Sequence, residues 1–221
     1  MEKVVVVIPA LNEQTTIRSV VESVRALGYP VLVVNDGSGD DTADEAHIGG
    51  AEVINSVGNY GVGAALSWGV SFAEKWMQAD IIAIMDADSQ HDPRDIPILV
   101  AALDGCDLVN GSRFLGSVDG MPFHRRVMLK FVYFVMWMLT GVEVTDPLSG
   151  LKCFKPETFR IRSHRFSWAA ELIWRTAKHG RIREVPAHMK YTEYSKNKGQ
   201  KSRHVFRVGL ELARSLTKGD V

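Results

Sequence analysis

Short apolar runs rich in β-branched residues alternate, over the first 110 residues, with segments whose apolar residues recur every three or four positions. Runs of the first kind predict buried strands, and segments of the second kind predict amphipathic helices. This alternation favours the α/β class, a Rossmann-like, mostly parallel sheet covered by helices on both faces. The expected strands are 4–8, 31–34, 52–55, 81–85 and 108–110, and the expected helices are 13–27, 40–47, 63–76 and 93–103.

The second half of the chain has a less regular pattern. Residues 121–140 form one helical pattern that is rich in aromatic residues and methionine. Because no internal repeat or low-complexity linker separates the halves, we expect a single domain over residues 1–221. The other elements expected here are helices at 167–179 and 205–216, strands at 181–186 and 188–194, and a lysine-rich loop at 194–203.

The helix expected at 121–140 is too short of uncharged apolar residues to span a bilayer, which needs about 18 or more in a row. Its longest apolar stretch covers residues 131–139, and the basic residues Arg125, Arg126 and Lys130 precede it. This pattern is typical of an interfacial helix that rests its apolar side on lipid. Burial in the core, or a homodimer face, explains the same pattern.

The net charge of zero hides a strong asymmetry between the halves. Residues 1–110 hold 17 acidic and 5 basic residues, whereas residues 111–221 hold 9 acidic and 21 basic ones. An acidic half suits cations, and a basic half suits phosphates, nucleic acid or an anionic membrane face. Attraction between the two halves across the fold is the alternative explanation.

Cysteine content and the N-terminal pattern bear on the compartment. Cys106 and Cys153 are too few for a disulfide framework, and no signal-peptide pattern precedes the apolar run that starts at residue 4. We therefore expect a cytoplasmic protein, peripheral on the cytoplasmic membrane face if the helix at 121–140 binds lipid.

The most informative polar segment is Asp86-Ala87-Asp88-Ser89-Gln90, directly after the expected strand at 81–85. Residues two apart on an extended segment point the same way, so both carboxylates can reach one divalent ion, and Gln90 adds a neutral oxygen. Mg²⁺ and Mn²⁺ prefer such ligands and keep positions open for phosphate oxygens. A solvated turn is the alternative, but the strand-end position favours a metal site.

Two further polar clusters follow strands of the same expected sheet. Asn12 and Glu13 follow the first strand, and Asp36 follows the second. In open α/β sheets ligands bind at the carboxyl ends of strands, so all three clusters should lie at one edge. Neither the glycine fingerprint of dinucleotide-binding proteins nor a Walker phosphate loop follows the first strand, and no serine-hydrolase elbow is present. Dehydrogenase, nucleoside triphosphatase and serine hydrolase functions are therefore disfavoured.

Several segments together resemble the family-2 inverting glycosyltransferases with the GT-A fold, and most closely the branch that contains dolichol-phosphate mannose synthases and other polyprenyl-phosphate glycosyltransferases. The resemblance covers roughly residues 4–217. It is carried, in order, by Val7-Ile8-Pro9-Ala10-Leu11-Asn12-Glu13, Val34-Asn35-Asp36-Gly37-Ser38-Gly39-Asp40-Asp41-Thr42, Asp86-Ala87-Asp88-Ser89-Gln90-His91-Asp92-Pro93, Gly111-Ser112-Arg113-Phe114, Asp146-Pro147-Leu148-Ser149-Gly150-Leu151 and Arg183-Glu184-Val185-Pro186.

The resemblance implies a role for each matched position. Residues 1–110 would hold the nucleotide-sugar donor and the metal, and residues 111–221 would form an acceptor-side subregion. Arg113 would contact phosphate, and Arg125 would lie on a helix at the membrane surface. The acceptor phosphate would be bound by Arg113, Arg125 and Lys196. The donor nucleotide would contact Pro9, Ala10, Asn12, Glu13, Asp36, Asp86 and Ala87; the metal, Mg²⁺ or Mn²⁺, would be held by Asp86, Asp88 and Gln90; and catalysis would depend on Asp88, Arg113 and Arg125.

The chain departs from the family's pattern at three places. Val62 stands where a lysine is common, Leu129 stands four positions after the helix arginine where a polar residue is usual, and Lys196 precedes Gly199 where an arginine is common. All three positions concern phosphate or acceptor contacts, so the identity of the acceptor is the part of the resemblance that they affect.

The nucleophile distinguishes two kinds of acceptor. A hydroxyl needs a general base, for which Glu171 is a candidate, whereas a phosphate monoester is already anionic at pH 7. The basic second half favours a polyprenyl phosphate, and a soluble enzyme acting on a hydroxyl of a glycan or small metabolite is the alternative. The lysine-rich segment 196–207 also suggests nucleic-acid binding, but its few aromatic residues disfavour that role, and we expect no nucleic-acid partner.

Overall fold

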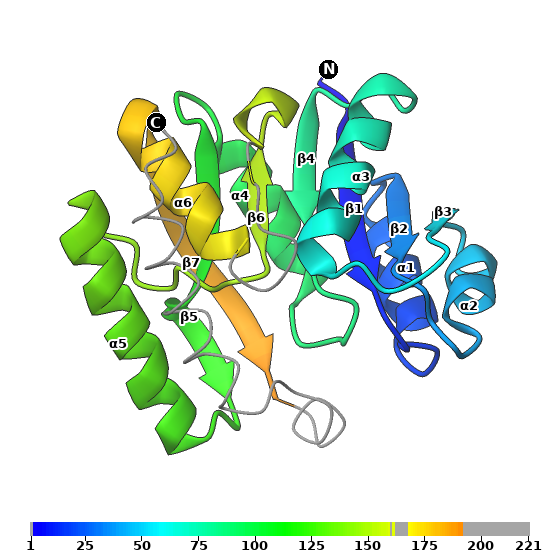
Figure 1. The fold of residues 1–221 in the computed structure, drawn as a ribbon, viewed down its shortest axis with the longest axis horizontal. Helices are drawn as coiled ribbons and strands as arrows, with labels where there is room; N and C mark the ends of the chain where they lie inside the picture. The colour runs from blue at the N-terminus through cyan, green and yellow to red at the C-terminus, as the bar shows by residue number, and fades with distance from the viewer. Residues whose placement is uncertain (1, 160, 162–167, 192–221) are drawn as a thin grey trace.

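A computed structural model describes residues 2–159, 161 and 168–191 of the chain, which form a seven-stranded sheet with helices on both faces (Figure 1). The strands lie in the order β3-β2-β1-β4-β6-β5-β7, so the sheet takes strands from both expected halves. Their bounds are β1 Val4–Ala10, β2 Val31–Asn35, β3 Glu52–Asn55, β4 Ile81–Ile84, β5 Leu108–Asp119, β6 Lys152–Phe154 and β7 Ile182–Lys190.

The sheet is mostly parallel, as the sequence predicts. Strand β1 pairs in parallel with β2 and β4, β2 pairs in parallel with β3, and β5 pairs in parallel with β7. The exception is β6, which lies antiparallel to both of its neighbours, β4 and β5. This short strand therefore joins the part of the sheet built from β1–β4 to the part built from β5 and β7.

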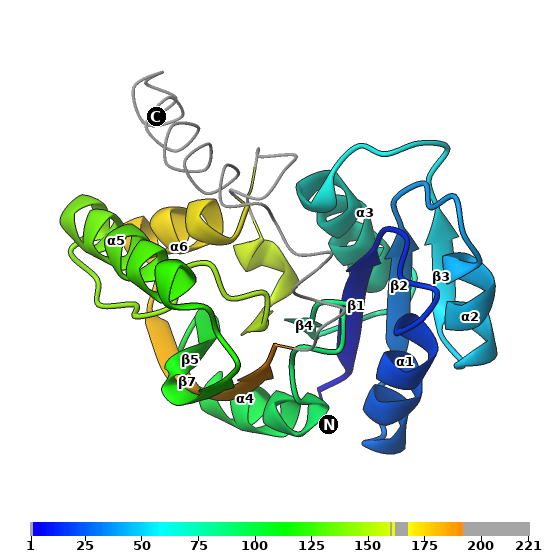
Figure 2. The ribbon, with the colours of Figure 1, turned by 90° about the horizontal axis from the view of Figure 1, so that it is seen from below.

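Alternate side chains of the strands enter two separate cores, because successive residues of a strand face opposite sides of the sheet. Val5 and Val7 pack under α3 and α6, whereas Val6 and Ile8 pack under α1, α2 and α4. Figure 2 shows the two helical layers on either side of the sheet, with α5 beside α6. The helices are α1 Ile17–Ala26, α2 Thr42–Ile48, α3 Val62–Lys75, α4 Ile96–Ala102, α5 Phe123–Thr140 and α6 Trp168–His179.

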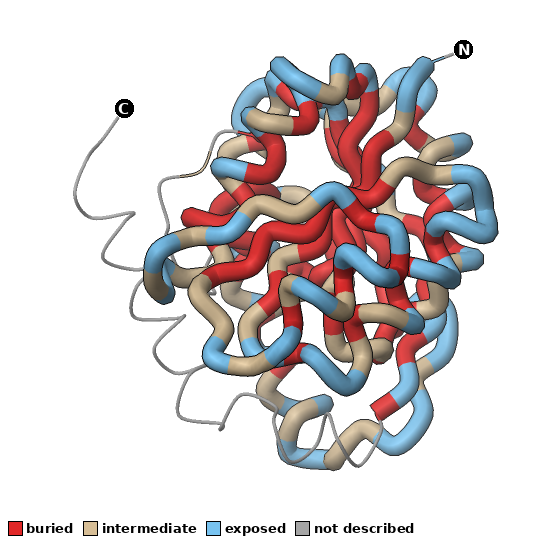
Figure 3. Tube along the Cα trace, turned by 90° about the vertical axis from the view of Figure 1, so that its right-hand side faces the viewer, coloured by how far each residue is buried: buried red, intermediate tan, exposed pale blue. Residues whose placement is uncertain are grey.

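Burial follows this layered arrangement, and Figure 3 shows the buried residues gathered in the strands at the centre. Helix α3 approaches the sheet closely at Gly69, where a Cβ atom would overlap Val7 and Val34 side chains. Two short 3₁₀ turns, at Pro93–Asp95 and Pro156–Thr158, complete the regular elements of the described residues.

The sequence prediction is wrong at three strands. Strand β6 was not predicted, because its three residues begin with a lysine and are too few to show a period. The two strands predicted at 181–186 and 188–194 are one strand, β7, which ends at Lys190, because Pro186 is tolerated on an edge strand and the burial alternation continues through it. Residues 192–194 lie outside the described residues. Strand β5 extends nine residues beyond its predicted end along β7. The loop predicted at 194–203 and the helix predicted at 205–216 lie outside the described residues.

Candidate active site

The carboxyl ends of β2, β1 and β4 lie side by side, because these three strands are parallel neighbours. The loops that follow them carry Asp36, Glu13 and Asp88 respectively. Glu13 lies close enough to Asp88 that its charge raises the pKa of that carboxyl. The clusters that the sequence placed at one sheet edge are thus brought together there.

Asp86 is the first residue of the expected metal pair, and its side chain keeps 41% of its surface exposed. Its Oδ2 lies 3.3 Å from Nε2 of His91, a residue that is otherwise buried. Burial opposes ionisation of Asp86, but the contact with His91 and the charges of Arg113 and Arg125 outweigh it. The pKa of Asp86 is therefore held below its ordinary value, so the group is a carboxylate.

Asp88 shows the opposite behaviour. Burial, reinforced by the negative charge of Asp86, raises the pKa of Asp88 from 3.8 to about 6. Gln90 holds the carboxylate from two directions, since its backbone N–H donates to Oδ1 at 3.1 Å and its side-chain amide donates to Oδ2 at 2.8 Å. Ser89, between them, has a φ of 59°, which folds the segment back on itself.

These observations fit a divalent cation. Two carboxylates crowded together repel each other, and a cation between them relieves that repulsion. No group of three or more acidic, histidine or cysteine side chains arranged for a metal occurs among residues 2–159, 161 and 168–191. A pair of carboxylates is the protein contribution that Mg²⁺ sites completed by substrate phosphates need. Gln90 as a third ligand stays a prediction.

The residues expected at the nucleotide brace the loops of this edge. Both oxygens of Asp36 accept backbone hydrogen bonds from the next loop, from N–H of Tyr60 at 2.9 Å and of Gly61 at 2.8 Å. Asn12 has a φ of 54° and accepts through Oδ1 from the Gly39 N–H at 2.8 Å. These side chains therefore fix the loops that follow β1, β2 and β3 relative to one another.

Three smaller residues complete the predicted nucleotide contacts. Pro9 and Ala10 end β1 opposite Val34 and Asn35, and Ala87 is buried between the two aspartates. Nucleotide contact by any of these positions stays a prediction.

Arg113 lies on β5 and is buried in a network of its own. Its Nε and its backbone N–H both donate to Oδ2 of Asp146, and its Nη1 donates to the hydroxyl of Tyr191 at 2.9 Å. Asp146 has no exposed surface, and its second oxygen, Oδ1, has no hydrogen-bond partner in the part of the chain that the structure describes. Although burial opposes it, the charge of Asp146 raises the pKa of Arg113, so the guanidinium stays protonated.

Arg125 reaches the same network from α5. Its guanidinium carbon lies 5.0 Å from the centre of the Tyr191 ring, within the range of a cation–π contact. Because the charges of Arg113 and Arg125 both lower the pKa of Asp86, the two guanidinium groups lie close to the carboxylate pair. The acidic and the basic side chains expected at the site therefore lie near each other at Asp86, and what they bind stays a prediction.

The turn that carries Asp146 is held by a residue to which the sequence gave no role. Glu184 accepts from the backbone N–H groups of Thr145 at 2.8 Å and Asp146 at 3.0 Å, and from the side chain of Asn110 at 2.8 Å. Glu184 belongs to the family motif at residues 183–186, which was the available signal for its importance.

Sequence reasoning also missed Lys152 on β6, which has no exposed surface. Its ammonium donates to Oδ1 of Asn110 on the adjacent strand. Burial lowers the pKa of Lys152 to about 8, although the charges of Asp146 and Glu184 oppose the shift. The available sequence signal was a lone lysine between two apolar residues, Leu151 and Cys153. The structure shows that both of these neighbours are fully buried.

Other predicted residues fall in less central places. Leu129 is buried on the inner side of α5, so the apolar residue at this departure from the family pattern packs in the core. Val62 is the first residue of α3. Glu171 is buried in the first turn of α6, where its Oε1 accepts from Arg175 at 2.7 Å. Lys196 lies outside the described residues.

Comparison with known proteins identifies the family. The sequence profile of glycosyl transferase family 2 matches residues 5–167 of the chain. An uncharacterized protein of Methanocaldococcus jannaschii is 32% identical over 96% of this chain and 91% of its own length. The dolichyl-phosphate N-acetylglucosaminyltransferase of Methanococcus voltae, which uses UDP-N-acetylglucosamine, is 29% identical over 93% of both chains. The polyprenol monophosphomannose synthase of Mycolicibacterium smegmatis is 29% identical over 84% of this chain and 76% of its own.

Solved structures agree with the fold. Glucosyl-3-phosphoglycerate synthase of Mycobacterium tuberculosis superposes with a TM-score of 0.75 over 98% of this chain and 80% of that one, at 24% identity. The same enzyme in complex with Mn²⁺, UDP and glucosyl-3-phosphoglycerate gives a TM-score of 0.72 at 25% identity, covering 95% and 79% of the two chains. With the sheet order and the profile match, these likenesses establish that the chain belongs to glycosyl transferase family 2 and is a glycosyltransferase of the GT-A fold.

Proposed function

We propose that this protein transfers a hexose, with inversion, from a nucleotide sugar of the GDP-mannose or UDP-glucose type to a polyprenyl phosphate, and that the reaction requires Mg²⁺ or Mn²⁺. The observation that carries the proposal is that Asp86 lies within electrostatic range of a second carboxylate, Asp88, and of the guanidinium groups of Arg113 and Arg125. A donor diphosphate needs a cation at one end, and an anionic acceptor needs positive charge beside it. Both needs are met within this one site.

Each half of the site then has its own task. Asp86 and Asp88 would hold the metal, which supplies a positive charge that offsets the charge growing on the leaving diphosphate. Gln90 keeps Asp88 in place through two hydrogen bonds, which would hold its carboxylate in position for the metal. Arg113, buried and always charged, would contact an oxygen of the acceptor phosphate.

The acceptor side favours a phosphate over a hydroxyl. A phosphate monoester is largely anionic at pH 7, so it needs to be held rather than deprotonated. Arg125 is half-buried, and its charge reaches the donor side of the site. The names of the Methanococcus voltae and Mycolicibacterium smegmatis relatives, which specify dolichyl-phosphate and polyprenol acceptors or products, support the same class of acceptor.

Contact with a membrane surface forms part of the proposal and rests on helix α5. No helix among the described residues has the length and apolarity to cross a bilayer. At about 100° per residue, five exposed apolar side chains of α5 lie within a stripe about 80° wide. Arg126 and Lys130 border this stripe, which suits an anionic lipid surface. The stripe consists of Phe123, Val127, Phe131, Phe134 and Met138.

The alternative is a soluble enzyme acting on a hydroxyl of a small metabolite. It is favoured by the solved mycobacterial synthase, whose structures include complexes with UDP-glucose, Mn²⁺ and phosphoglyceric acid. In that case Glu171 is the candidate base. Its position beside Arg175 instead indicates an ion pair within α6, which keeps the carboxylate engaged.

A transfer assay tests the proposal. Purified protein with Mn²⁺ is incubated with labelled GDP-mannose, UDP-glucose or UDP-N-acetylglucosamine and with undecaprenyl phosphate in anionic vesicles. The label should move to the lipid with one of the donors, and Asp88→Ala should abolish the transfer. Transfer only to a water-soluble acceptor, combined with loss of activity in Glu171→Gln, would instead establish the alternative.

A further inference from the structure

Tyr191 contacts both arginines of the site. It lies directly after β7 and is only 4% exposed. Its hydroxyl accepts the hydrogen bond from Arg113 Nη1 at 2.9 Å, and the guanidinium of Arg125 stands 5.0 Å from its ring centre. Its backbone N–H donates to the Asp119 carbonyl at 2.9 Å, which ties it to the end of β5.

Two guanidinium groups gathered around one buried ring repel each other. Asp146 forms an ion pair with Arg113, whereas the guanidinium of Arg125 makes no ion pair and no hydrogen bond within residues 2–159, 161 and 168–191. The N–H donors of Arg125 are therefore available to an anionic ligand, although its charge also acts on Asp86 at longer range. The hydroxyl of Tyr191 adds a hydrogen-bond donor at the same place, since it accepts from Arg113 and keeps its own proton.

We infer that Tyr191 is a positioning residue that sets Arg113 and Arg125 at the spacing needed to bind one phosphate monoester. The inference rests on the proposed function, which it deepens by naming the residue that defines the acceptor-phosphate site. The hydroxyl fixes Arg113 through a hydrogen bond, and the aromatic face fixes Arg125 through its charge. The ligand chemistry is a phosphate monoester, whether it ends a polyprenyl chain or a small metabolite.

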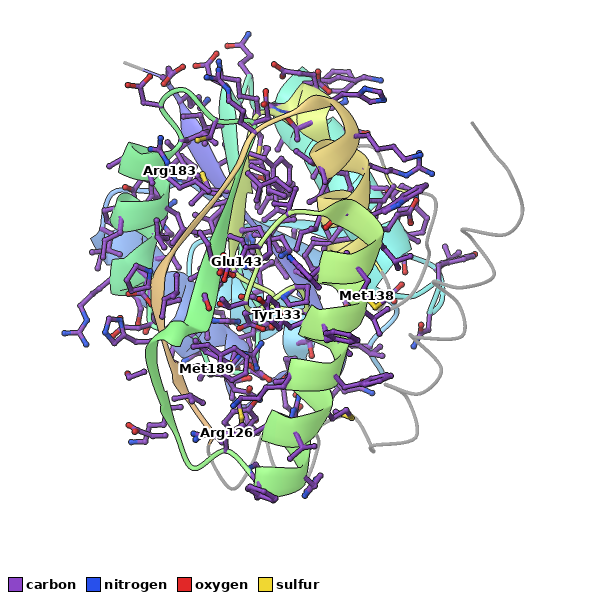
Figure 4. All side chains as sticks on the ribbon, turned by 90° about the vertical axis from the view of Figure 1, so that its left-hand side faces the viewer. Arg126, Tyr133, Met138, Glu143, Arg183 and Met189 are labelled. Carbon is purple, nitrogen blue, oxygen red and sulfur yellow. The ribbon has the colours of Figure 1, made fainter. Side chains whose placement is uncertain are left out.

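Helix α5 and strand β7 place these groups from two directions, so the site joins separate elements. Figure 4 shows α5 beside β5 and β7, with Arg126 near its N-terminal end, Tyr133 midway and Met138 near its far end, and with Met189 on β7. Arg125 is the neighbour of Arg126, and Tyr191 follows Met189 by two residues. Loss of the Tyr191 contacts would uncouple the helix from the strand at the site without removing either arginine.

The test uses calorimetric titration and does not depend on knowing the sugar. Geranyl phosphate and 3-phosphoglycerate are titrated separately into full-length protein with Mn²⁺ and UDP or GDP. Tyr191→Phe keeps the ring and loses the hydroxyl, so phosphate binding should weaken about tenfold. Tyr191→Leu also loses the aromatic face and should weaken it about fivefold further. Tyr133→Phe, a tyrosine two turns beyond Arg125 on α5, serves as the matched control and should bind like the wild type.

Binding of UDP or GDP with Mn²⁺, measured in the same variants, separates positioning from general damage. It should stay within about twofold of the wild type, because a lost hydrogen bond acts only on groups that it touches. Three results would each overturn the inference. They are wild-type phosphate affinity in Tyr191→Phe, an equal loss of nucleotide affinity and phosphate affinity in that variant, and no phosphate binding by the wild-type protein. Binding of 3-phosphoglycerate but not geranyl phosphate would refute the lipid acceptor and leave the role of Tyr191 intact.

Discussion

Gly150 packs against the carboxylate of Asp86 so closely that a methyl group on residue 150 would overlap Oδ2 of the aspartate. The glycine belongs to the turn before β6, and Asp86 follows β4, the strand with which β6 pairs. The backbone of the turn before β6 therefore packs directly against the carboxylate that we propose binds the metal.

Gly150→Ala should displace the Asp86 carboxylate and lower transfer activity by roughly tenfold to a hundredfold, as small misplacements of reacting groups do. The φ of Gly150 is not in the left-handed region, so alanine fits the backbone and the fold should persist. The Mn²⁺ concentration that gives half-maximal activity should rise in the variant. Gly39→Ala is the matched control, because a Cβ there meets nothing within 4 Å. Wild-type metal dependence in Gly150→Ala would contradict the assignment of Asp86.

Asp88→Asn should abolish activity and yet stabilise the metal-free protein at pH 7.5. A carboxyl whose pKa rises to about 6 in the fold binds an extra proton between about pH 4 and 6. The free energy of unfolding therefore falls as the pH rises through this window. Above about pH 6 the fold carries the full free-energy cost of the ionised, buried Asp88. The raised pKa corresponds to about 3 kcal/mol, and partial exposure reduces the expected gain on substitution to about 1 to 2 kcal/mol.

Urea unfolding of this variant in the presence of EDTA measures the gain. Asp92→Asn is the control with the opposite sign, because the side-chain hydrogen bond from Arg94 lowers the pKa of Asp92 and its charge is favourable. A loss of stability in Asp88→Asn would show that the two carboxylates do not repel each other in the folded protein.

The burial of Lys152 predicts that the free energy of unfolding rises with pH in the alkaline range. Its pKa falls from 10.5 to about 8 in the fold because of burial, so the unfolded chain binds more protons between these values. The free energy of unfolding therefore increases from pH 8 to about 10.5 as Lys152 loses its proton. Below pH 8 the fold carries the full free-energy cost of burying the charged ammonium. Relative to Lys152→Met, the wild-type protein should gain about 2 kcal/mol of unfolding free energy between pH 7.5 and 10.

Guanidinium unfolding at four or five pH values measures this difference directly. Lys155→Met, three residues further at an exposed position, controls for the alkaline response of lysines in general. Parallel curves for the wild type and Lys152→Met would mean that the ammonium of Lys152 is not destabilised by its burial.

The exposed stripe on α5 should decide lipid binding. A triple variant, Phe123→Ser, Phe131→Ser and Met138→Ser, should reduce flotation with anionic vesicles by at least about tenfold, because each buried apolar side chain contributes about 1.5 to 3 kcal/mol. The three side chains are between 65% and 81% exposed, so folding stability should change little. Ile48→Ser with Trp76→Ser removes exposed apolar residues elsewhere and should not change flotation. Unchanged flotation of the triple variant would refute lipid contact through α5.

Much of the donor side was readable from the sequence. The strands β1–β4 and the helices between them have strong periodic patterns, and polar residues stand where each strand ends. The positions of Asp86 and Asp88 follow from the end of β4 alone. Their opposite pKa shifts do not follow from it, because burial raises the pKa of Asp88, whereas His91 and the charges of Arg113 and Arg125 lower that of Asp86 against its burial. The two arginines come from distant segments of the chain.

The acceptor side was less readable because its order depends on contacts between distant segments. Arg113 has two hydrogen-bond partners, Asp146 at 33 residues and Tyr191 at 78 residues along the chain. No local period reports such a pairing, and the three residues of β6 carry no period at all. Family motifs marked residues 146–151 and 183–186, but the motif alone did not say that Glu184 holds the turn of Asp146.

Strand β6 has a mechanical consequence. It lies between β4 and β5, so two inter-strand spacings, about 10 Å in total, separate the strand before Asp86 from the strand that carries Arg113. Because β6 is hydrogen-bonded to β4 on one side and to β5 on the other, it keeps these two strands at a fixed distance. That distance cannot change without breaking the hydrogen bonds on one of the two sides. The gap between the two charged halves of the site is therefore set by the backbone.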